Sequence, residues 1–455
     1  MKRHYHLIGI GGIGMSGIAQ LLLRKGFKVS GSDMNENNIT GTLKDLGADI
    51  FTGHSGSNIM GAEVVVYSSA IKEDNPELME AKARGIPLVR RAEALARLME
   101  DEDVITVAGS HGKTTTASMV SYLLLKAGFH PTVAVGGVLR NIGTNACLGD
   151  GKFFVAEADE SDGSFLYYRP KYSIITNIDL EHLDYYKDFN AELRAFGEFI
   201  RNTREDGCVF VSEDDKNLKG LTAGYKNKNI FFGLKESAQI YPGNILMKGL
   251  SSEFDCFYKG KLLERFCLPL GGKHNISNAL SVIALGLELG IDVSLIKEAL
   301  RGYGGAKRRL EVKFEDKDYL LIDDYAHHPT EIKATLDALR GFQPNRLIAV
   351  FQPHRYTRTK LLLDEFAGSL DLADYIIITD IYAAGEEPLK GVSAELIYEK
   401  IKARLPDKEV YFLPKEKIAG HILKAIKPRD ILITLGAGDI VKVCDELAEG
   451  IKRKG

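Results

Sequence analysis

Short apolar runs alternate with helix-spaced hydrophobic positions along the first hundred residues of the chain. Strands are predicted over 6–10, 27–33 and 63–69, and helices after Gly14, over 76–84 and over 91–99. Such alternation is typical of a parallel sheet covered by helices on both faces. We interpret the charged segment 99–103 as a linker that ends this part of the chain.

The same pattern starts again at residue 104. Strands are predicted over 104–109, 132–137, 152–159 and 172–177, and a helix over 113–127. Beyond Cys208 the pattern changes to short strands separated by turns, to about residue 268, which predicts an antiparallel annex to the parallel sheet. Helices are predicted over 275–289 and 293–301.

A third part of the chain begins near Arg309. Strand-then-helix units are predicted over 318–330 and from 346, 374 and 430 onward, so this part is again a doubly wound α/β structure. Polar residues and glycines follow the strands of all three parts. Ligands of open α/β sheets bind at the carboxyl ends of the strands, so this layout is typical of an enzyme with several ligand sites.

Length, charge and cysteines set the outer limits. The 455 residues correspond to roughly three domains of about 150 residues. The formal net charge of −3 argues against a nucleic-acid partner, and no apolar run is long enough to insert into a membrane. The five scattered cysteines suit a reducing compartment. We therefore expect a cytoplasmic protein, as a monomer or weak homodimer.

Glycine is in excess, with 46 residues against a usual level of about 7%. Part of the excess lies in GIGGIGMSGIA at 9–19, where both Gly9-x-Gly11-x-x-Gly14 and Gly12-x-Gly14-x-x-Gly17 fit the dinucleotide fingerprint. Asp33 follows at the end of the next predicted strand, the place of a ribose-binding acid. NAD and a UDP-sugar make similar demands on this loop, and a tight turn without a ligand is the simpler alternative.

A second glycine loop, VAGSHGKTTT at 107–116, also connects a predicted strand to a helix. It contains Gly112-Lys113-Thr114 but has valine where the usual phosphate-binding loop has its first glycine. Backbone N–H groups can still surround a phosphate, Lys113 can meet the β/γ oxygens, and Thr114 or Thr115 can hold Mg²⁺. A dehydrogenase needs the first loop only, and a simple ATPase needs the second loop only.

Acidic residues follow the next two strands. VAEADESDGSF at 155–165 contains Glu157, Asp159, Glu160 and Asp162, and TNIDLEHLDYY at 176–186 contains His182 among further carboxylates. Crowded carboxylates repel one another unless a cation is present, so the two segments predict a metal site beside Lys113. A solvated acidic loop and a salt-bridged histidine are the alternatives.

At this point the chain resembles a known family. GSHGKTT, EADESD and NIDLEHLDYY are similar to motifs of the Mur ligases, which form amide bonds with ATP in cell-wall peptidoglycan synthesis. The N-terminal glycine loop is similar to that of the branch that adds L-alanine to UDP-N-acetylmuramate. Further similar segments follow in the family's order: GGKHNISNAL (271–280), GAKRRLE (305–311), DDYAHHPTEI (323–332), FQPHRYTRT (351–359) and LGAGDI (435–440).

The resemblance implies a three-domain α/β architecture. It consists of a Rossmann-like UDP-sugar domain over 1–102, a central ATP-binding domain of the P-loop type with an antiparallel annex over 103–306, and a Rossmann-like C-terminal domain over 307–455. It also implies an acyl-phosphate intermediate, formed from the lactyl carboxylate and ATP and then attacked by the amine of L-alanine, with release of ADP and phosphate. Two Mg²⁺ ions are expected.

The resemblance also implies roles for individual residues. Catalytic roles fall to Lys113, Glu157, His182 and Arg309, and metal binding to Thr114, Glu157 and His182. The expected ATP-binding residues are Gly109, Ser110, His111, Gly112, Lys113, Thr114, Thr115, His274, Asn275, Asn278 and Asp324. The expected UDP-sugar residues are Gly11, Gly12, Gly14, Met15, Ser16, Asp33, Ser68, Ser69 and Ala70. The expected amino-acid residues are Tyr325, His327, His354, Arg355 and Arg358.

Simpler readings remain for some of these residues. Asn275 could be the N-cap of the helix that follows it, Arg309 could form an interdomain salt bridge, and the C-terminal arginines could be surface charges. Three other functions also stay open. They are a family member that adds a whole tripeptide to the same UDP-sugar, an NAD-dependent oxidoreductase, and a degenerate ligase that only senses the UDP-sugar.

Overall fold

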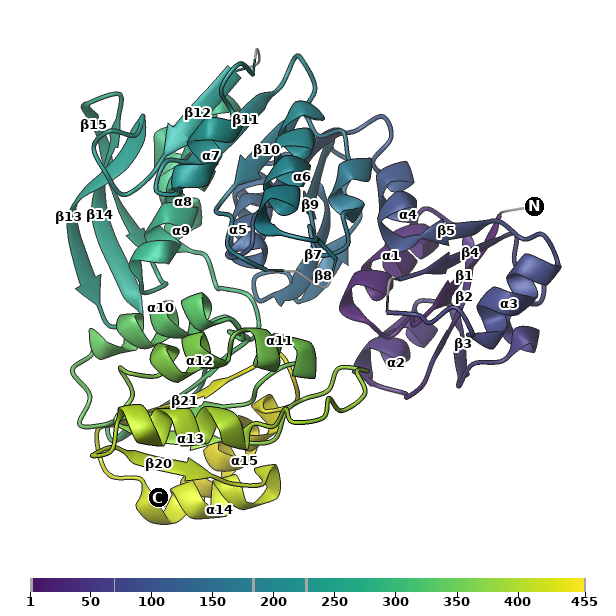
Figure 1. Ribbon diagram of the computed structural model, residues 1–455. Coiled ribbons are helices and arrows are strands. Elements are labelled where there is room, and N and C mark those ends of the chain that lie inside the picture. The colour runs from purple at the N-terminus through teal and green to yellow at the C-terminus, as the bar shows by residue number, and fades with distance from the viewer. Residues whose placement is uncertain (1–2, 69, 182–184, 226–227, 454–455) are drawn as a thin grey trace. The chain divides into compact units, whose positions relative to one another are not determined.

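The computed structural model describes residues 3–68, 70–181, 185–225 and 228–453 (Figure 1). The chain divides into two compact units. The first holds Met1–Gly243, Asp255–Arg265 and Ser277–Gly304, and the second holds Asn244–Phe254, Phe266–Ile276 and Gly305–Gly455. The described residues contain three sheets, and each is covered by helices that follow its strands in the sequence.

The first sheet has the strand order β3-β2-β1-β4-β5, with every pair parallel. Its strands are β1 (His4–Ile8), β2 (Lys28–Asp33), β3 (Asp49–Thr52), β4 (Val64–Tyr67) and β5 (Leu88–Arg90). Its helices are α1 (Ile13–Arg24), α2 (Asn38–Asp45), α3 (Pro76–Ala83), α4 (Arg91–Leu98) and the short 3₁₀ helix η1 (Gly56–Ile59). The strand order reverses at β1, so the first glycine loop leaves the sheet where open α/β sheets bind ligands. The strand predicted over 6–10 ends at Ile8 instead, because Gly9 turns the chain with a φ of 76°.

The two faces of this sheet are built differently. Alternate residues of a strand point to opposite faces, and Leu7, Val29 and Val66 join the large apolar core. On the opposite face Ile8 and Val65 belong to a much smaller apolar cluster. That face also carries buried polar side chains from two neighbouring strands: His4, His6, Ser30 and Ser32.

The central sheet has the strand order β15-β14-β13-β12-β11-β10-β6-β9-β7-β8. Its strands are β6 (Asp103–Ala108), β7 (Thr132–Leu139), β8 (Thr144–Cys147), β9 (Phe153–Glu157), β10 (Tyr172–Ile175), β11 (Cys208–Ser212), β12 (Lys228–Phe232), β13 (Ile240–Lys248), β14 (Ser251–Tyr258) and β15 (Lys261–Leu268). Its helices are α5 (Lys113–Lys126), η2 (Ser164–Tyr167), α6 (Phe189–Arg201), α7 (Lys216–Leu221), α8 (Lys273–Glu288) and α9 (Val293–Arg301). The second glycine loop leaves β6, between its neighbours β9 and β10, which is again a switch in strand order.

Two details of this sheet differ from the sequence predictions. The change of pattern was placed at Cys208, but β11 and β12 continue the sheet in parallel, so that boundary was wrong. The next strand, β13, also pairs parallel with β12, at Phe232 and Ile240. The short strand β8 was not predicted, and it pairs antiparallel with β7.

The third sheet has the order β16-β17-β21-β18-β19-β20. Its strands are β16 (Glu311–Glu315), β17 (Tyr319–Asp324), β18 (Leu347–Phe351), β19 (Tyr375–Ile378), β20 (Glu409–Phe412) and β21 (Asp430–Leu435). Its helices are α10 (Pro329–Arg340), α11 (Tyr356–Leu361), α12 (Leu363–Ser369), α13 (Glu395–Arg404), α14 (Lys415–Ala425) and α15 (Val441–Lys452). Only β16 pairs antiparallel among the described pairs, and each face carries its own apolar core. The predicted fold class, three α/β parts on largely parallel sheets, is confirmed.

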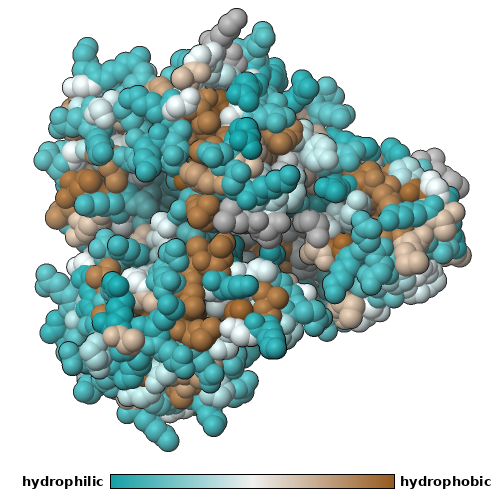
Figure 2. Space-filling model, viewed as in Figure 1, coloured by the Kyte–Doolittle hydropathy of each residue, from teal (hydrophilic) through white to brown (hydrophobic). Residues whose placement is uncertain are grey.

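No described helix combines the length and the apolar character that a membrane crossing requires. Much of the face shown in Figure 2 is hydrophilic, with smaller hydrophobic areas between the polar residues.

Candidate active site

Hydrogen bonds join the first glycine loop to the end of β2. The N–H groups of Gly9 and Ile10 both donate to the carbonyl oxygen of Ser32, at 2.8 and 3.0 Å. The N–H of Gly11 donates to Asp33 Oδ2 at 2.9 Å. A Cβ on Gly11 would lie 2.9 Å from that same oxygen, so only glycine allows this approach. In this conformation the Asp33 carboxylate fixes the loop.

The start of α1 offers backbone rather than side chains to a ligand. Gly12 is the N-cap, and among the described residues no side chain caps α1 and no acid lies in its first turn. The predicted sugar residues Met15 and Ser16 are buried, and the Ser16 hydroxyl donates to the carbonyl of Ile13 at 2.9 Å. Because the N-terminus of a helix attracts anions, a phosphate can bind to the N–H groups of this turn.

The remaining residues predicted for the UDP-sugar follow β4. Ser68 is half-buried and accepts the N–H of Ile71 at 3.1 Å through its carbonyl, while Ala70 is exposed. Ser69 lies outside the described residues. Ser68 therefore follows the carboxyl end of β4, a strand adjacent to β1.

A buried carboxylate lies beneath the first loop, and the sequence reasoning missed it. Glu77 of α3 is fully buried and accepts hydrogen bonds from the Ser32 hydroxyl and the Asn58 amide, both at 2.6 Å. Ring nitrogens of His6 and His54 lie 3.6 and 3.4 Å from its carboxylate. Burial alone raises the pKa of Glu77, but these hydrogen bonds outweigh it and lower the pKa to about 2. Glu77 thus fixes the position of the Ser32 side chain, next to Asp33 in the sequence.

In the second glycine loop, two glycines are required by close approaches. Gly109 has a φ of 132°, and a Cβ there would lie 2.2 Å from Thr176 Oγ1. Gly112, the N-cap of α5, has a φ of 84°, and a Cβ there would lie 2.8 Å from Asn278 Oδ1. Asn278 was predicted to contact ATP, and the structure brings it beside the loop.

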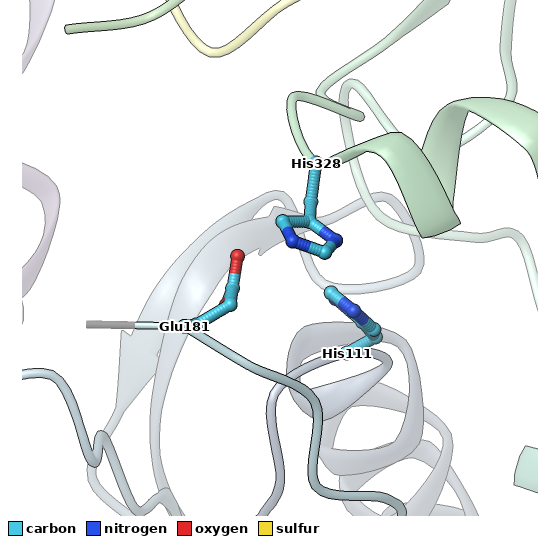
Figure 3. A group of neighbouring side chains, drawn as sticks. All are labelled: His111, Glu181 and His328. Atoms are coloured by element: carbon cyan, nitrogen blue, oxygen red, sulfur yellow. The ribbon is translucent and has the colours of Figure 1, made fainter. Parts of the chain in front are cut away.

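The loop is also tied to the segment that follows β10. Asn177 accepts the N–H of Ser110 through its backbone oxygen at 3.0 Å and the N–H of His111 through Oδ1 at 2.9 Å. The His111 ring contacts Asp179 Oδ2 at 3.1 Å. A ring nitrogen of His111 and a carboxylate oxygen of Glu181 lie within 4.8 Å of each other, and Figure 3 shows both side chains reaching into one space. His182, the predicted metal ligand that comes next, lies outside the described residues.

Lys113 is paired with a buried glutamate. Its Nζ donates to the Gly109 carbonyl at 2.7 Å and to both carboxylate oxygens of Glu160 at 2.7 and 2.8 Å. Glu160 is fully buried, so for this residue the alternative of a solvated acidic loop was wrong. Burial opposes the charge of Lys113, but the carboxylates of Glu160 and Asp159 outweigh it and raise the pKa. The ammonium is therefore charged and already turned toward the loop.

An oxygen-rich site lies beside this ion pair. The Thr114 hydroxyl donates to Glu157 Oε2 at 3.0 Å, and the Gly136 N–H donates to Oε1 at 2.5 Å. Of the two threonines that the sequence left open, Thr114 is the one that meets Glu157, whereas the Thr115 carbonyl accepts the Ser118 hydroxyl inside α5. A hydroxyl and a carboxylate are ligands that Mg²⁺ prefers, so these residues fit a magnesium ion.

The segment around His274 contains the start of α8, but Asn275 is not the N-cap of this helix. The helix starts at Lys273, so Asn275 lies inside its first turn rather than at the cap. Its Nδ2 donates back to the Gly271 carbonyl at 2.7 Å. The ring of His274 lies over Gly272, where a Cβ would be 2.5 Å from it.

The paired arginines before β16 have separate roles. Arg308 donates to Asp323 Oδ2 at 2.9 Å and to the carbonyls of Gly436 and Gly438 at 2.7 and 2.9 Å, which joins three segments of the second unit. Arg309 instead lies 3.6 Å from Glu331 and 5.2 Å from the ring centre of Tyr325, within the same unit.

Asp324 is buried at the end of β17. Its two carboxylate oxygens accept the N–H groups of Leu310 and Ala326, at 2.8 and 2.7 Å. Burial raises the pKa of Asp324 to about 6, although the nearby Arg309 opposes the shift. Asp324, predicted to bind ATP, thus has both carboxylate oxygens occupied by backbone donors in this conformation.

The structure brings most of the predicted amino-acid residues together. The rings of His327 and His354 meet edge to face at 5.4 Å, the ring of Tyr325 lies 5.5 Å from that of His327, and Arg358 Nη1 lies 3.5 Å from His354 Nδ1. Burial, together with the Arg358 guanidinium, lowers the pKa of His354 to about 4 and that of His327 well below its usual value. Both rings are therefore neutral at pH 7. Arg355 is the N-cap of α11, in the left-handed region with a φ of 68°.

Three family models match the chain in succession. They are described as the Mur ligase family, catalytic domain, over residues 4–103, the Mur ligase middle domain over 107–286, and the Mur ligase, glutamate ligase domain, over 308–438.

Individual proteins match over nearly the whole length. UDP-N-acetylmuramate–L-alanine ligase of Geotalea uraniireducens (strain Rf4) is 46% identical over 447 residues, which cover 98% of this chain and 98% of that protein. The crystal structure of UDP-N-acetylmuramate-alanine ligase from Thermotoga maritima matches with a TM-score of 0.85 and 31% identity, over 99% of this chain and 100% of that one. A murein peptide ligase from Psychrobacter arcticus 273-4 matches with a TM-score of 0.73 and 25% identity, over 99% and 98%.

Proposed function

This chain belongs to the Mur ligase family, and from that premise we propose that it joins L-alanine to the lactyl carboxylate of UDP-N-acetylmuramate with consumption of ATP. The observation that carries the proposal is the 46% identity to an L-alanine ligase over 98% of both chains. Family membership also decides against the NAD-dependent oxidoreductase. A cytoplasmic location is part of the same proposal.

We assign each ligand to one part of the chain. UDP-N-acetylmuramate binds to residues 1–102 through the first glycine loop, whose turn offers N–H groups to the diphosphate. ATP binds to residues 103–306 through the second glycine loop, with Asn278 beside it. L-alanine binds to residues 307–455, where a guanidinium such as that of Arg358 can pair with its carboxylate.

Lys113 holds the transferred phosphate in this proposal. Its ammonium already lies against the loop carbonyl of Gly109, and a γ-phosphate would join Glu160 as a second anionic partner. Thr114 and Glu157 would hold one Mg²⁺, and His182 is proposed to hold a second. When bound, the ions would neutralise charge on the phosphate oxygens. Arg309 is proposed to have a catalytic role as well.

The reaction needs activation because a carboxylate is a poor electrophile. The lactyl carboxylate attacks the γ-phosphorus, ADP leaves, and an acyl phosphate remains. The alanine amine then attacks the acyl carbon, and phosphate leaves. The amine must lose a proton, and His327 and His354 are both neutral and able to accept one. The protein mainly positions the reactants and neutralises charge.

A coupled assay tests the proposed function. ADP release should require both UDP-N-acetylmuramate and L-alanine, and omission of either should reduce it to background. A solved structure that is 30% identical over 68% of this chain is named as the ligase that joins L-alanyl-γ-D-glutamyl-meso-diaminopimelate to UDP-N-acetylmuramate, so this tripeptide is the second amine to compare. Faster turnover with the tripeptide than with L-alanine would overturn the proposed specificity and favour the recycling reaction. ADP release without any amine acceptor would contradict both.

A further inference from the structure

Arg91, the first residue of α4, fills the space that a glycine leaves at the start of α1. A Cβ on Gly14 would lie 3.2 Å from Arg91 Nη1 and 3.3 Å from its Cδ. A side chain at the last glycine of the Gly9-x-Gly11-x-x-Gly14 fingerprint would therefore press on Arg91, so the arginine lies directly against the first turn of α1. The side chain of Arg91 is 24% exposed, so part of it remains accessible.

The same guanidinium faces the acidic segment after β9. Arg91 Nη2 lies 3.5 Å from Asp159 Oδ2, and α4 contacts η2, which follows that segment. Burial opposes the charge of Arg91, but Tyr168 and then the carboxylates of Asp159, Asp162 and Glu157 outweigh it and raise its pKa. A positive charge thus lies beside both the first turn of α1 and Asp159.

The first glycine loop has no cationic side chain of its own. Residues 9–19 contain no lysine or arginine, whereas the second loop carries its own Lys113. A guanidinium presents paired N–H groups that match a carboxylate or a phosphate. Arg91 is placed to supply this charge at the first turn of α1, where the helix N-terminus already favours an anion.

We propose that Arg91 binds an oxyanion of the sugar nucleotide at the first turn of α1, and that Asp159 is a positioning residue that orients the guanidinium. The oxyanion is either the diphosphate or the lactyl carboxylate, because both present the same chemistry. This inference rests on the proposed function, since it takes UDP-N-acetylmuramate as the ligand of the first loop.

The test measures binding without catalysis. Calorimetric titrations with UDP-N-acetylmuramate, with UDP and with ATP compare the full-length chain with Arg91→Ala, Arg91→Lys and Arg97→Ala. Arg97 lies on the same helix and pairs with Glu93 at its surface, so it is the matched control. Arg91→Ala should weaken UDP-N-acetylmuramate about tenfold to a hundredfold, as expected for a hydrogen bond to a charged group. Arg91→Lys should weaken UDP-N-acetylmuramate binding by an intermediate amount, because lysine keeps the positive charge but lacks the paired N–H groups of the guanidinium.

The UDP titration identifies the oxyanion. If Arg91→Ala lowers the affinity for both UDP and UDP-N-acetylmuramate, Arg91 contacts the diphosphate. If it lowers the affinity for UDP-N-acetylmuramate alone, Arg91 contacts the lactyl carboxylate. ATP affinity should stay within twofold in the Arg91 and Arg97 variants, which shows that these variants are folded. Asp159→Asn should give a smaller loss in the same direction, and no added loss when combined with Arg91→Ala.

Two failures are distinguishable. A wild-type chain that does not bind UDP-N-acetylmuramate overturns the proposed function. A wild-type chain that binds it, with Arg91→Ala binding equally well, overturns the role of Arg91 and leaves the proposed function standing. A loss of ATP affinity equal to the loss of sugar-nucleotide affinity also overturns it, because the effect would then be structural.

Discussion

A fully buried glutamate lies beneath each of the two glycine loops, and the two glutamates have different partners. Under the second loop, Glu160 pairs with the ammonium of Lys113. Under the first loop, Glu77 accepts hydrogen bonds from the neutral side chains of Ser32 and Asn58, with two histidine rings nearby. The first loop has no cation of its own, and the second has one that is already compensated.

The two buried glutamates therefore have different roles: Glu160 acts on a residue proposed to be catalytic, whereas Glu77 only positions the backbone. An ion pair that includes Lys113 can exchange partners when an anionic ligand arrives, so Glu160 holds a reactive cation ready. The Glu77 network contains no group that we assign to a ligand, and it acts only through the strand end that supports Asp33 and Gly11. Changes under the second loop should therefore affect both turnover and stability, and changes under the first should affect stability alone.

The largest expected effect is that of Lys113→Ala. Loss of the ammonium removes stabilisation of the transferred phosphate, so alanine-dependent phosphate release should fall at least about a thousandfold. The affinity for UDP-N-acetylmuramate should stay within twofold. Phosphate release and calorimetry measure the two quantities. Turnover at the wild-type rate would contradict the role of Lys113.

Lys113→Ala also leaves Glu160 buried without its cation, which should cost about 3–5 kcal/mol of stability. The double variant Lys113→Ala/Glu160→Gln should recover most of that stability and none of the activity. Lys126→Ala is the matched control, because Lys126 is exposed at the other end of α5. If the double variant regained activity, the loss in the single variant would be structural.

The second expected effect compares one glycine from each loop. Gly109→Ala places a Cβ 2.2 Å from Thr176 Oγ1 at a φ of 132°, which should cost about 2–4 kcal/mol and weaken ATP binding at least about tenfold. Gly12→Ala meets only the Gly9 carbonyl, at 3.4 Å, with an ordinary φ of −72°. Thermal melting and ATP titration should therefore show a large loss for the first variant and a small one for the second. Equal losses would contradict the steric argument.

Local sequence patterns predicted these loops well because their requirements are local. A strand, two glycines, a lysine and a helix lie within ten residues, so the position of Lys113 at the start of α5 follows from the sequence. Whether two strands pair parallel or antiparallel depends on the path of the chain between them, so a local pattern does not predict it. This is why the parallel strands β11 and β12 were assigned to an antiparallel annex and β8 was missed.

The buried partners could not be predicted from the sequence. Glu160 stands 47 positions from Lys113, and only the arrangement of β6 and β9 makes them neighbours. Glu77 follows Pro76 at the start of a helix, where an acid is ordinarily a solvated first-turn residue. Arg91 lies in a helix without any motif. In each case the contact depends on how separate segments pack, which one sequence does not encode locally.

The third expected effect is a pH dependence of stability from Glu77. Its pKa is lowered from 4.5 to about 2 on folding, so its ionised form stabilises the fold above pH 4.5, and this contribution is lost as the pH falls toward 2. The full contribution is about 3 kcal/mol. Glu77→Gln should therefore be less stable than wild type at pH 7, and the gap should narrow below pH 4.5.

Denaturant unfolding at a series of pH values measures that gap. Glu80→Gln is the control, because Glu80 lies on the same helix and pairs with Arg84 at the surface. The control should differ little from wild type at any pH. A gap between Glu77→Gln and wild type that stays constant from pH 7 to pH 3 would rule out an ionised Glu77 as the source.

The smallest expected effect concerns Asn37, which joins α2 to the first loop. Its Oδ1 accepts the N–H groups of Ile39 and Thr40, both at 2.9 Å, and its Nδ2 lies 3.4 Å from the Gly11 carbonyl. Asn37→Ala removes the cap and should cost about 1 kcal/mol, and hydrogen exchange of the first α2 amides should quicken by about fivefold. Asn37→Ser restores a cap acceptor without the amide donor. Recovery of slow exchange in Asn37→Ser, with UDP-N-acetylmuramate affinity unchanged in both variants, would show that this residue supports the helix rather than the first loop. Continued fast exchange in Asn37→Ser would instead make the long contact with Gly11 the important one, and would extend the polar support of the first loop from Glu77 to α2.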